Sequence, residues 1–397
     1  MNGIGSRWVE IDTDAIVHNL EQIKKLLRPE TKIMGVVKAN AYGCGAVEVA
    51  RCLVGQGISM LGVTTVDEGL ELRQHGISAP VLIFAPILPQ EADDVVANDL
   101  TVSVSETEIL KPLAEAARER DRKAKVHIKV ETGMGRTGIL PEEVLSFIRA
   151  AVEYSSLIEI DGIYTHLATA GTDPGFAWEQ FRRFQRVLEM LEQEGVHIPL
   201  KHVCNSAATL LYPEMHLSMV RIGTLLYGQK PPGIKKDELG LKDPWKFKAR
   251  IIHLREVPPG TSIGYGRDYI TREKTRIAVI PVGYADGFTV EPAVRPKGWI
   301  DLFKVLIKTI LNYWGWLRSP TVVHIGHARA RVVGRVGMQL TMIDVGHLPD
   351  VRLGDEVEIH VRRTSLNPRL PRVYLRQGRP YVVSSISGIT EERREYL

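Results

Sequence analysis

The sequence predicts an α/β protein, a (β/α)8 TIM-like barrel followed by a mostly β C-terminal domain. Between residues 30 and 225, eight short β-rich runs alternate with longer helical patterns, which is the count and spacing of such a barrel. After the Pro-Pro-Gly at 231–233 the long helical patterns stop, and β-like runs punctuated by Gly and Pro follow. We therefore expect a barrel domain at 9–234 and a second domain at 235–397. Strand counting leaves a doubly wound open sheet as the alternative.

The barrel strands are short apolar runs, and most of them are separated by segments of helical periodicity. The expected strands are Lys32–Val37, Ser59–Thr64, Pro80–Phe84, Leu100–Val104, Lys125–Glu131, Leu157–Tyr164, Leu200–Cys204 and Met219–Ile222. The expected helices include 66–75, 105–122, 141–154 and 176–194. In the second domain, β-like runs lie at Ala249–Arg255, Thr275–Pro281, Ala330–Val336 and Glu356–Val361.

One segment, WIDLFKVLIKTILNYWGWLRSP at 299–320, interrupts the β pattern. Polar residues recur in it at helical spacing and leave a wide apolar face, so we expect an amphipathic helix inserted at about 296–319. Its charges fit poorly with a transmembrane span. The helix either packs on its own protein, which is the simpler interpretation, or contacts a membrane surface or partner protein through 299–317.

The composition is that of an ordinary globular protein, with 397 residues, 44% hydrophobic and 25% charged. This length is enough for two domains with full cores. A net charge of +4 is small for the length and gives no reason to expect nucleic acid as a partner. Three cysteines without paired spacing argue against a disulfide framework or a zinc site. The N-terminus lacks the apolar region of a signal peptide, so a cytoplasmic location is expected.

The stretch VVKANAYGCGA at 36–46 carries the first chemical signal. A short apolar run ends at Lys38, and small residues, Tyr42 and two glycines precede a helical pattern. A lysine at the end of a buried strand loses hydration, so its pKa should fall and its amine can act as a nucleophile. The stretch alone leaves open the alternative of a lysine that only reaches solvent or pairs with a carboxylate.

Other polar residues also lie where the predicted strands end, the face that carries barrel active sites. After the fifth to eighth strands these residues are Arg136 in GMGRTG, His166 in YTHLATA, Asn205 and Ser206 in HVCNSAAT, and Arg221 and Gly223 in MVRIGTLLYG. Each has an ordinary structural explanation, such as a helix cap, a core histidine or a solvated arginine. Their repeated placement at one face is much harder to attribute to packing.

This group of residues suits an anionic cofactor bound covalently to lysine. Ser206 and the amides around Ile222 and Gly223 can hold a phosphate, and Tyr42 can add a phenolic hydrogen bond. The chain has no GxxxxGK[ST] motif, so a nucleoside triphosphate is not indicated. A reactive lysine beside a phosphate cradle points to pyridoxal 5'-phosphate (PLP).

VVKANAYGCGA also resembles the PLP-lysine motif of the alanine racemase family, and the resemblance extends from about Val9 to about Tyr374. It implies that Lys38 binds the cofactor and acts as one of two acid/base groups. The remaining cofactor contacts that it implies are Tyr42, Asn205, Ser206, Arg221, Ile222 and Gly223. Arg221 resembles the arginine that faces the pyridine nitrogen. A guanidinium cannot accept a proton, so the ring nitrogen would stay unprotonated, which favours simple reprotonation of substrate over transamination.

The resemblance gives roles to two further barrel residues. Arg136 is similar to the arginine that binds the cofactor's phenolic oxygen and the substrate carboxylate. Lys129, in HIKVETGMGR, matches a lysine that is carbamylated in some members. An unmodified lysine there would crowd Arg136 electrostatically.

In the second domain, TSIGYGRDYI resembles the segment that bears the family's catalytic tyrosine, here Tyr265. The resemblance implies a homodimer in which this tyrosine enters the barrel of the partner subunit and is tuned by His166. Tyr284 in PVGYADGF resembles an entrance residue. Met338 in GRVGM resembles the residue whose amide meets the substrate carboxylate.

The chain departs from the family pattern in three places. Gly337 and Gln339 stand where the family often has Cys and Asp, in a loop that faces the substrate. The family's Asn-Tyr-Glu stretch is missing after EIHVRR, and residues 291–320 resemble an insertion. The first two departures bear on substrate choice and the third on partners.

These features lead us to expect a homodimeric PLP-dependent amino-acid racemase that interconverts L- and D-alanine. The enzyme alternatives are a racemase of broader specificity, for serine or basic amino acids, and a barrel-type PLP decarboxylase. A non-catalytic PLP carrier is the alternative of another class. Arg221 argues against decarboxylation, which gains from a protonated ring, and the presence of a full second domain argues against the carrier.

Overall fold

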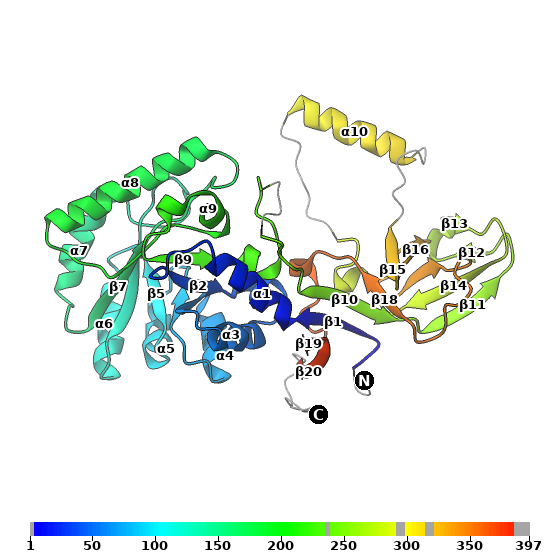
Figure 1. Ribbon diagram of the computed structural model, residues 1–397, viewed down its shortest axis with the longest axis horizontal. Helices are drawn as coiled ribbons and strands as arrows, with labels where there is room; N and C mark the ends of the chain where they lie inside the picture. The colour runs from blue at the N-terminus through cyan, green and yellow to red at the C-terminus, as the bar shows by residue number, and fades with distance from the viewer. Residues whose placement is uncertain (1–3, 235–238, 291–297, 314–320, 385–397) are drawn as a thin grey trace. The chain divides into compact units, whose positions relative to one another are not determined.

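The computed structural model describes residues 4–234, 239–290, 298–313 and 321–384. The chain forms two compact units. One is Asp12–Pro244, called here the barrel unit, and the other joins Met1–Ile11 to Trp245–Leu397 and is called the β unit (Figure 1). The sequence prediction began the barrel domain at residue 9 and the second domain at 235, whereas the first strand of the chain belongs to the β unit.

The barrel unit is built on an eight-stranded parallel sheet in the order β8-β7-β6-β5-β4-β3-β2-β9. The strands are β2 (Lys32–Val36), β3 (Met60–Val63), β4 (Val81–Ile83), β5 (Thr101–Val104), β6 (Ala124–Lys129), β7 (Ile158–Tyr164), β8 (Leu200–His202) and β9 (Met219–Ile222). All eight were expected from the sequence, with ends that differ by at most two residues. The two edges are joined where Ser218 N donates to Lys201 O at 3.2 Å and Arg221 N to Cys204 O at 3.0 Å. The sheet is therefore a nearly closed barrel, and the doubly wound open sheet is excluded.

Helices lie outside the strands of the barrel unit (Figure 1). The α-helices are α1 (Thr13–Lys24), α2 (Lys38–Tyr42), α3 (Ala46–Gly55), α4 (Val66–Gln74), α5 (Ala92–Ala97), α6 (Leu110–Glu119), α7 (Val144–Val152), α8 (Pro174–Gln193) and α9 (Ser206–Leu211), and the 3-10 helices are η1 (Pro89–Glu91), η2 (Pro141–Glu143), η3 (Pro213–Met215) and η4 (Thr224–Tyr227). Local sequence explains several starts. The Asp12 carboxylate caps α1, and Thr65 with Glu68 forms a capping box on α4.

The barrel interior is packed with side chains rather than open. An apolar cluster fills it, made of Met34, Met60, Leu82, Tyr164, Leu200 and Met219 with Phe84 packed against them. The interior also buries His127, His202 and Arg221, each no more than 4% exposed. Burying a polar group costs free energy unless the group is paired, and these three side chains contact one another through their nitrogen atoms.

The β unit contains a ten-stranded sheet in the order β11-β14-β17-β16-β15-β18-β10-β1-β19-β20 and a small β12-β13 ribbon. Its strands are β1 (Arg7–Asp12), β10 (Trp245–Arg250), β11 (His253–Val257), β12 (Ser262–Ile263), β13 (Tyr269–Ile270), β14 (Thr275–Ile280), β15 (Val322–Ile325), β16 (Ala328–Val333), β17 (Thr341–Asp344), β18 (Glu356–Ile359), β19 (Arg372–Arg376) and β20 (Arg379–Ser384), with 3-10 helices η5 (Tyr265–Arg267), η6 (Tyr284–Asp286) and η7 (Arg363–Ser365). The run expected at Ala249–Arg255 crosses a break, because β10 ends and β11 begins within it.

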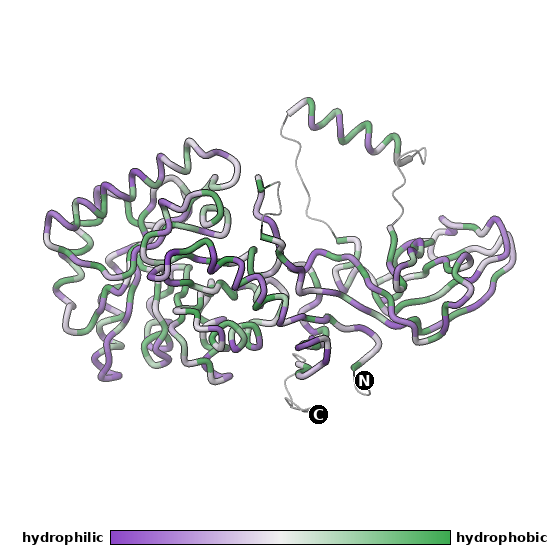
Figure 2. The backbone as a smooth tube through the Cα atoms, viewed as in Figure 1, coloured by the Kyte–Doolittle hydropathy of each residue, from purple (hydrophilic) through white to green (hydrophobic). Residues whose placement is uncertain are grey.

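Helix α10 (Trp299–Tyr313) is the inserted amphipathic helix of the β unit. Figure 2 shows hydrophobic and hydrophilic residues alternating along it. Most of its large apolar side chains are exposed, including Trp299 at 87% and Phe303 at 65%. The rest of the expected segment, up to residue 320, lies outside the described residues. Within the part of the chain that the structure describes, no helix is both long enough and apolar enough to cross a membrane.

Candidate functional site

A cavity of about 390 Å³ opens in the barrel unit where the strands end. Nine residues expected from the sequence line it, namely Lys38, Tyr42, Lys129, Arg136, His166, Asn205, Ser206, Arg221 and Gly223. Ile222, the tenth barrel residue expected at the site, is fully buried on β9. The structure therefore brings side chains from five strand ends into one pocket, as parallel barrels do.

Lys38 follows β2 and starts an unusual turn. The next four residues, 39–42, all have φ between +50° and +55°, the left-handed region that L-residues avoid. Glu68 holds the start of the turn, because its carboxylate accepts a hydrogen bond from Ala39 N at 2.6 Å. A second carboxylate oxygen accepts from Thr64 N at 2.7 Å, which ties the turn to the end of β3. The lysine is thus presented from a strained but well-supported segment.

The environment of Lys38 makes its amine a nucleophile. Burial lowers its pKa, and the charges of Arg136 and Arg221 lower it further, against an opposing contribution from Glu68. A larger fraction of the amine is therefore neutral near pH 7 than for an exposed lysine.

Arg221 is the central cation of the site. Its guanidinium donates to Thr165 O and to Val203 O, each at 2.9 Å, and lies 5.1 Å from the centre of the Tyr164 ring. It also contacts Nδ1 of His202 at 2.8 Å and Nδ1 of His166 at 3.3 Å. Burial lowers the pKa of Arg221 to about 10, so the group stays charged near pH 7. Because a guanidinium can only donate, both histidines must accept through Nδ1.

His166 is therefore a neutral imidazole with its proton on Nε2. Burial lowers its pKa to about 3, and the charges of Arg221 and Arg136 act in the same direction. The Nε2–H group is left as a hydrogen-bond donor of the site.

The loop that carries Arg136 is organised by a single carboxylate. Glu131 accepts hydrogen bonds from the backbone N–H groups of four successive residues, 133–136, at 2.5, 2.5, 2.9 and 3.3 Å. Next to this loop, Lys129 donates to the hydroxyl of Thr137. Burial lowers the pKa of Lys129 to about 8, assisted by the charges of Arg136 and Arg221.

Tyr42, Ser206 and Gly223 meet at another wall of the cavity. Gly223 N donates to Ser206 Oγ at 3.0 Å. A Cβ atom on Gly223 would lie 2.5 Å from the Tyr42 hydroxyl, so the close approach requires glycine. Burial raises the pKa of Tyr42 to about 12, which keeps its phenol protonated and able to donate. Asn205 instead caps α9, with its Oδ1 accepting from Ala208 N at 3.0 Å.

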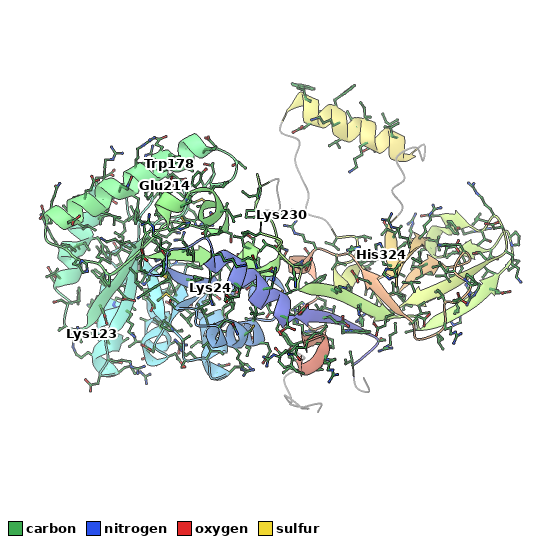
Figure 3. All side chains as sticks on the ribbon, viewed as in Figure 1. Lys24, Lys123, Trp178, Glu214, Lys230 and His324 are labelled. Atoms are coloured by element: carbon green, nitrogen blue, oxygen red, sulfur yellow. The ribbon has the colours of Figure 1, made fainter. Side chains whose placement is uncertain are left out.

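A loop after β7, residues 167–172, covers part of the cavity. Tyr212 holds it by donating from its hydroxyl to Ala170 O at 2.9 Å. Trp178, labelled on α8 in Figure 3, meets the Tyr212 ring edge-on at 5.9 Å between centroids. The loop is thereby fixed by buried aromatic contacts.

The site residues expected from the second domain lie together within the β unit. Tyr265 on η5, Tyr284 on η6 and Met338 are 74%, 49% and 59% exposed. Two backbone hydrogen bonds join the last two segments, from Tyr284 N to Gly337 O at 3.1 Å and from Ala285 N to Met338 O at 3.0 Å. An ion pair between Asp268 and Arg335 joins the Tyr265 segment to the segment that precedes Met338. The β unit thus presents three exposed side chains from linked loops.

Sequence reasoning missed several polar residues around the site, namely Glu68, His127, Glu131, Asp161 and His202. A usable signal existed for one of them. Alternate residues of a barrel strand face the interior, so the choice of Lys129 could have pointed to His127, two residues earlier on β6.

Comparison with known proteins agrees with this geometry. The family model for the alanine racemase N-terminal domain matches residues 11–231, and the model for the C-terminal domain matches 245–373. The chain is 39% identical over 361 residues to alanine racemase 1 of Oceanobacillus iheyensis, covering 89% of this chain and 88% of that protein. It is 40% identical over 355 residues to alanine racemase of Desulforamulus reducens, covering 89% of each.

Solved structures of alanine racemases are also similar to this chain. The alanine racemase of Clostridium difficile 630 superposes with a TM-score of 0.85 at 33% identity, covering 96% of this chain and 98% of that one. The Bacillus anthracis alanine racemase with bound L-Ala-P gives 0.80 at 29% identity, covering 97% and 99%. The chain belongs to the alanine racemase family and is an isomerase, an amino-acid racemase of the alanine racemase type.

Proposed function

We propose that the enzyme interconverts L- and D-alanine with PLP bound at Lys38. The observation that carries the proposal is the combination, in one barrel cavity, of a lysine with a lowered pKa and a buried arginine that can only donate. The names of the relatives support alanine as substrate, and the full second unit argues against a non-catalytic carrier.

The residues of the cavity fit the cofactor. Gly223, Ser206 and Tyr42 form a narrow polar wall in which a Cβ atom at 223 has no room, which suits a phosphate group. Arg221 would face the ring nitrogen, and the amine of Lys38 would hold the cofactor covalently. When bound, PLP withdraws electrons from the substrate α-carbon and so makes its proton removable.

Two bases on opposite faces of the substrate would move the proton. Lys38 serves one face, and the phenol of Tyr265 from the partner subunit serves the other in a homodimer with shared sites. The Nε2–H of His166 would donate to the Tyr265 oxygen and stabilise its deprotonated form. Because the guanidinium of Arg221 cannot accept a hydrogen bond from a protonated ring nitrogen, that nitrogen would stay unprotonated, which favours simple return of the α-proton over transamination.

Arg136, Met338 and Tyr284 would orient the substrate. Arg136 supplies a cation for its carboxylate, Met338 a backbone amide, and Tyr284 borders the entrance. Lys129 is a candidate for carbamylation, since a neutral amine reacts with carbon dioxide and its pKa lies near 8. The resulting anion would pair with Arg136 and relieve the present repulsion between two cations.

The test of the reaction is exchange of the α-hydrogen. Purified enzyme is incubated with each L-amino acid in deuterated water, and the products are separated by chiral chromatography. We expect deuterated D-alanine as the main product. Comparable turnover of serine or lysine would support the broader-specificity alternative, and loss of the carboxylate would indicate a decarboxylase. The visible absorbance of bound PLP without any exchange would indicate a carrier.

The test of the shared site is subunit complementation. Tyr265→Phe should keep PLP and lose racemisation by orders of magnitude, whereas Lys38→Ala should lose the covalent link. When the two inactive variants exchange subunits, some heterodimers should carry one intact site and regain activity. The exposed Tyr265 segment also offers Arg267→Ala as a matched variant that should remain active. Confirmed subunit exchange without recovered activity would mean either that the whole site lies in one chain or that Tyr265 is not the second base.

We also propose that α10 docks on an anionic lipid surface. Trp299, Phe303, Leu306 and Ile310 recur at helical spacing along one side and are 50% to 87% exposed. Lys304 and Lys308 lie on the other side with Asp301, giving it a net positive charge. This division matches helices that lie in a membrane interface.

Vesicle sedimentation tests this proposal. The enzyme should bind phosphatidylcholine vesicles that contain phosphatidylglycerol more strongly than vesicles without it. Deleting 296–319, or changing Phe303→Glu, should abolish binding and keep racemase activity, while Thr309→Glu on the flank of the polar side should weaken binding less. Equal sedimentation of the wild type and Phe303→Glu would refute a lipid role.

A further inference from the structure

A line of buried polar groups continues from Arg221 through the barrel interior. Arg221 Nη1 lies 2.8 Å from Nδ1 of His202, and His202 Nε2 lies 3.0 Å from Nδ1 of His127. His127 Nε2 then lies 3.6 Å from the Asp161 carboxylate, just beyond hydrogen-bond length but within ion-pair distance. Both imidazoles are fully buried, whereas the Asp161 side chain is 28% exposed. The line therefore connects the cation of the cavity with an anion on β7.

The protons along this line have only one consistent arrangement. The guanidinium of Arg221 can only donate, so Nδ1 of His202 accepts and its proton is on Nε2. That Nε2–H donates to Nδ1 of His127, whose own proton is then on Nε2, the atom that lies 3.6 Å from the Asp161 carboxylate without a hydrogen bond. Both histidines are neutral, because burial lowers the pKa of each. Every N–H along the line therefore points from the arginine towards the carboxylate.

The surrounding chain is shaped to hold these rings. Gly162 pairs with His127 across β7 and β6 at a local irregularity of the ladder. A Cβ atom on Gly162 would lie 2.5 Å from Cε1 of His127, so glycine makes the space for the ring. The His202 ring stacks on the Tyr164 ring, with centroids 4.7 Å apart and planes within 3°. Burial and stacking leave neither imidazole room to turn.

We propose that His127 and Asp161 are positioning residues: from the Nε2 side they stabilise the His202 tautomer that Arg221 requires, and so they help to hold the guanidinium of Arg221 in place for the reaction. Asp161 acts as a remote counter-ion for Arg221, and two neutral rings transmit its polarity. The inference rests on the proposed role of Arg221 opposite the cofactor. Its importance follows from burial, because a His202 with its proton on Nδ1 could not accept, and one donor of the buried guanidinium would then be unpaired.

The charged groups at both ends define the electrostatics. At the carboxylate end, Asp161 faces His127 and the more distant Lys125 and Lys32. At the cavity end, Arg221 shares its surroundings with Lys38, Lys129 and Arg136, all cations when protonated. Asp161 is thus the negatively charged group at the far end of the line, and it opposes the positive charge of the pocket. The polar contact with His127 Nε2 at 3.6 Å lowers the pKa of Asp161, which keeps it ionised at neutral pH.

A matched pair of substitutions at 127 separates positioning from packing. His127→Gln keeps one acceptor for His202 and one donor for Asp161, whereas His127→Leu removes both and leaves His202 Nε2–H unpaired. The full-length enzyme is labelled with ¹⁵N-histidine, and the imidazole resonances are recorded without substrate, with PLP bound and after its removal. We expect one Nε2–H tautomer of His202 in the wild type and in His127→Gln. We expect shifted or doubled His202 resonances in His127→Leu.

Kinetics of the PLP-bound enzyme give the second readout. His127→Leu and Asp161→Asn should lower kcat about tenfold with little change in KM, and His127→Gln should restore most of the loss. Glu159→Gln, an exposed carboxylate on the same strand, is the control and should have no effect.

The two readouts also separate the possible failures. A folded His127→Leu enzyme in which His202 keeps its wild-type resonances would overturn the proposal. Equal loss of kcat in His127→Gln and His127→Leu would overturn it too. Because the resonances are read without substrate, failure of the racemase proposal would leave this test of the tautomer intact.

Discussion

Gly223→Ala tests the polar wall of the cavity most directly. The new Cβ would lie 2.5 Å from the Tyr42 hydroxyl and 3.1 Å from the ring carbon that bears it. Tyr42 cannot easily retreat, because its ring packs 4.9 Å from that of Tyr227, which is fully buried and donates to Val36 O at 2.8 Å. Overpacking of this kind costs about 1–3 kcal/mol. For a unit of this size that corresponds to a fall in Tm of roughly 2–12 °C.

The assay combines thermal unfolding with cofactor titration. Gly223→Ala should lower Tm by the amount given and weaken PLP binding, because Tyr42 is pushed from its place. Tyr42→Phe removes the hydroxyl and leaves only the 3.1 Å contact, so the double variant should lose less stability than the sum of the two single changes. A coupling of at least about 0.5 kcal/mol is expected for residues in contact.

Gly55→Ala is the matched control for Gly223→Ala. A Cβ atom at position 55 meets open space at the end of α3, so Tm should stay the same or rise slightly. Wild-type Tm and PLP affinity in Gly223→Ala, or strict additivity with Tyr42→Phe, would refute the close contact on which the reasoning depends.

Three further predictions concern pH. In CO2-free buffer, Lys129→Met should stabilise the protein most below pH 8 and lose this advantage as the pH rises towards 10. The reason is that burial lowers the pKa of Lys129 to about 8 in the folded state, so the folded protein loses the unfavourable buried charge at a lower pH than the unfolded chain loses its proton. Urea unfolding at several pH values measures the difference in stability, and an advantage that grows with pH would contradict the prediction. Burial alone would raise the pKa of Glu131, but hydrogen bonds from four backbone N–H groups outweigh it and lower the pKa. Glu131→Gln should therefore lower Tm at pH 7, and its Tm should approach that of the wild type as the pH falls through the folded-state pKa of Glu131. His166, with its pKa lowered to about 3, should contribute no ionisation of its own to the pH profile of kcat/KM above pH 5, and ¹⁵N-histidine spectra recorded across that range should show its ring neutral throughout; a protonation step of His166 between pH 5 and 7 would contradict this.

The barrel and its cavity could be predicted from the sequence because both follow from strong, local rules. Short apolar runs gave the strands, and the tendency of parallel barrels to collect function at strand ends gave Lys38, Arg136 and Arg221. Asn205 also lines the cavity, and it has a second role. A polar residue that follows a strand can serve as a helix cap, and its side chain does cap α9.

The line from Arg221 to Asp161 could not have been predicted in the same way. In the sequence His127 and His202 look like isolated core residues, because only the closed barrel brings their ring nitrogens, one on β6 and one on β8, to 3.0 Å from each other. The membership of the first strand in the β unit also escaped prediction. Strand β1 pairs with β10, which follows more than 230 residues later, and no local pattern encodes such a distant partner. Tyr265 was recognised from the family resemblance alone, since by itself it reads as a turn residue between glycines.

The pairing of β1 with β10 has a consequence for how the protein is made. Trp8, Val9 and Ile11 are completely buried, yet they are synthesised long before their partner strand. Their neighbour in the sheet, β10, begins only at residue 245, so at ordinary rates of translation they wait roughly 12–50 seconds without it. During that time the barrel can form while an apolar strand remains unpaired ahead of it. The unpaired apolar strand is therefore a segment that a chaperone would have to shield from aggregation until β10 has been made.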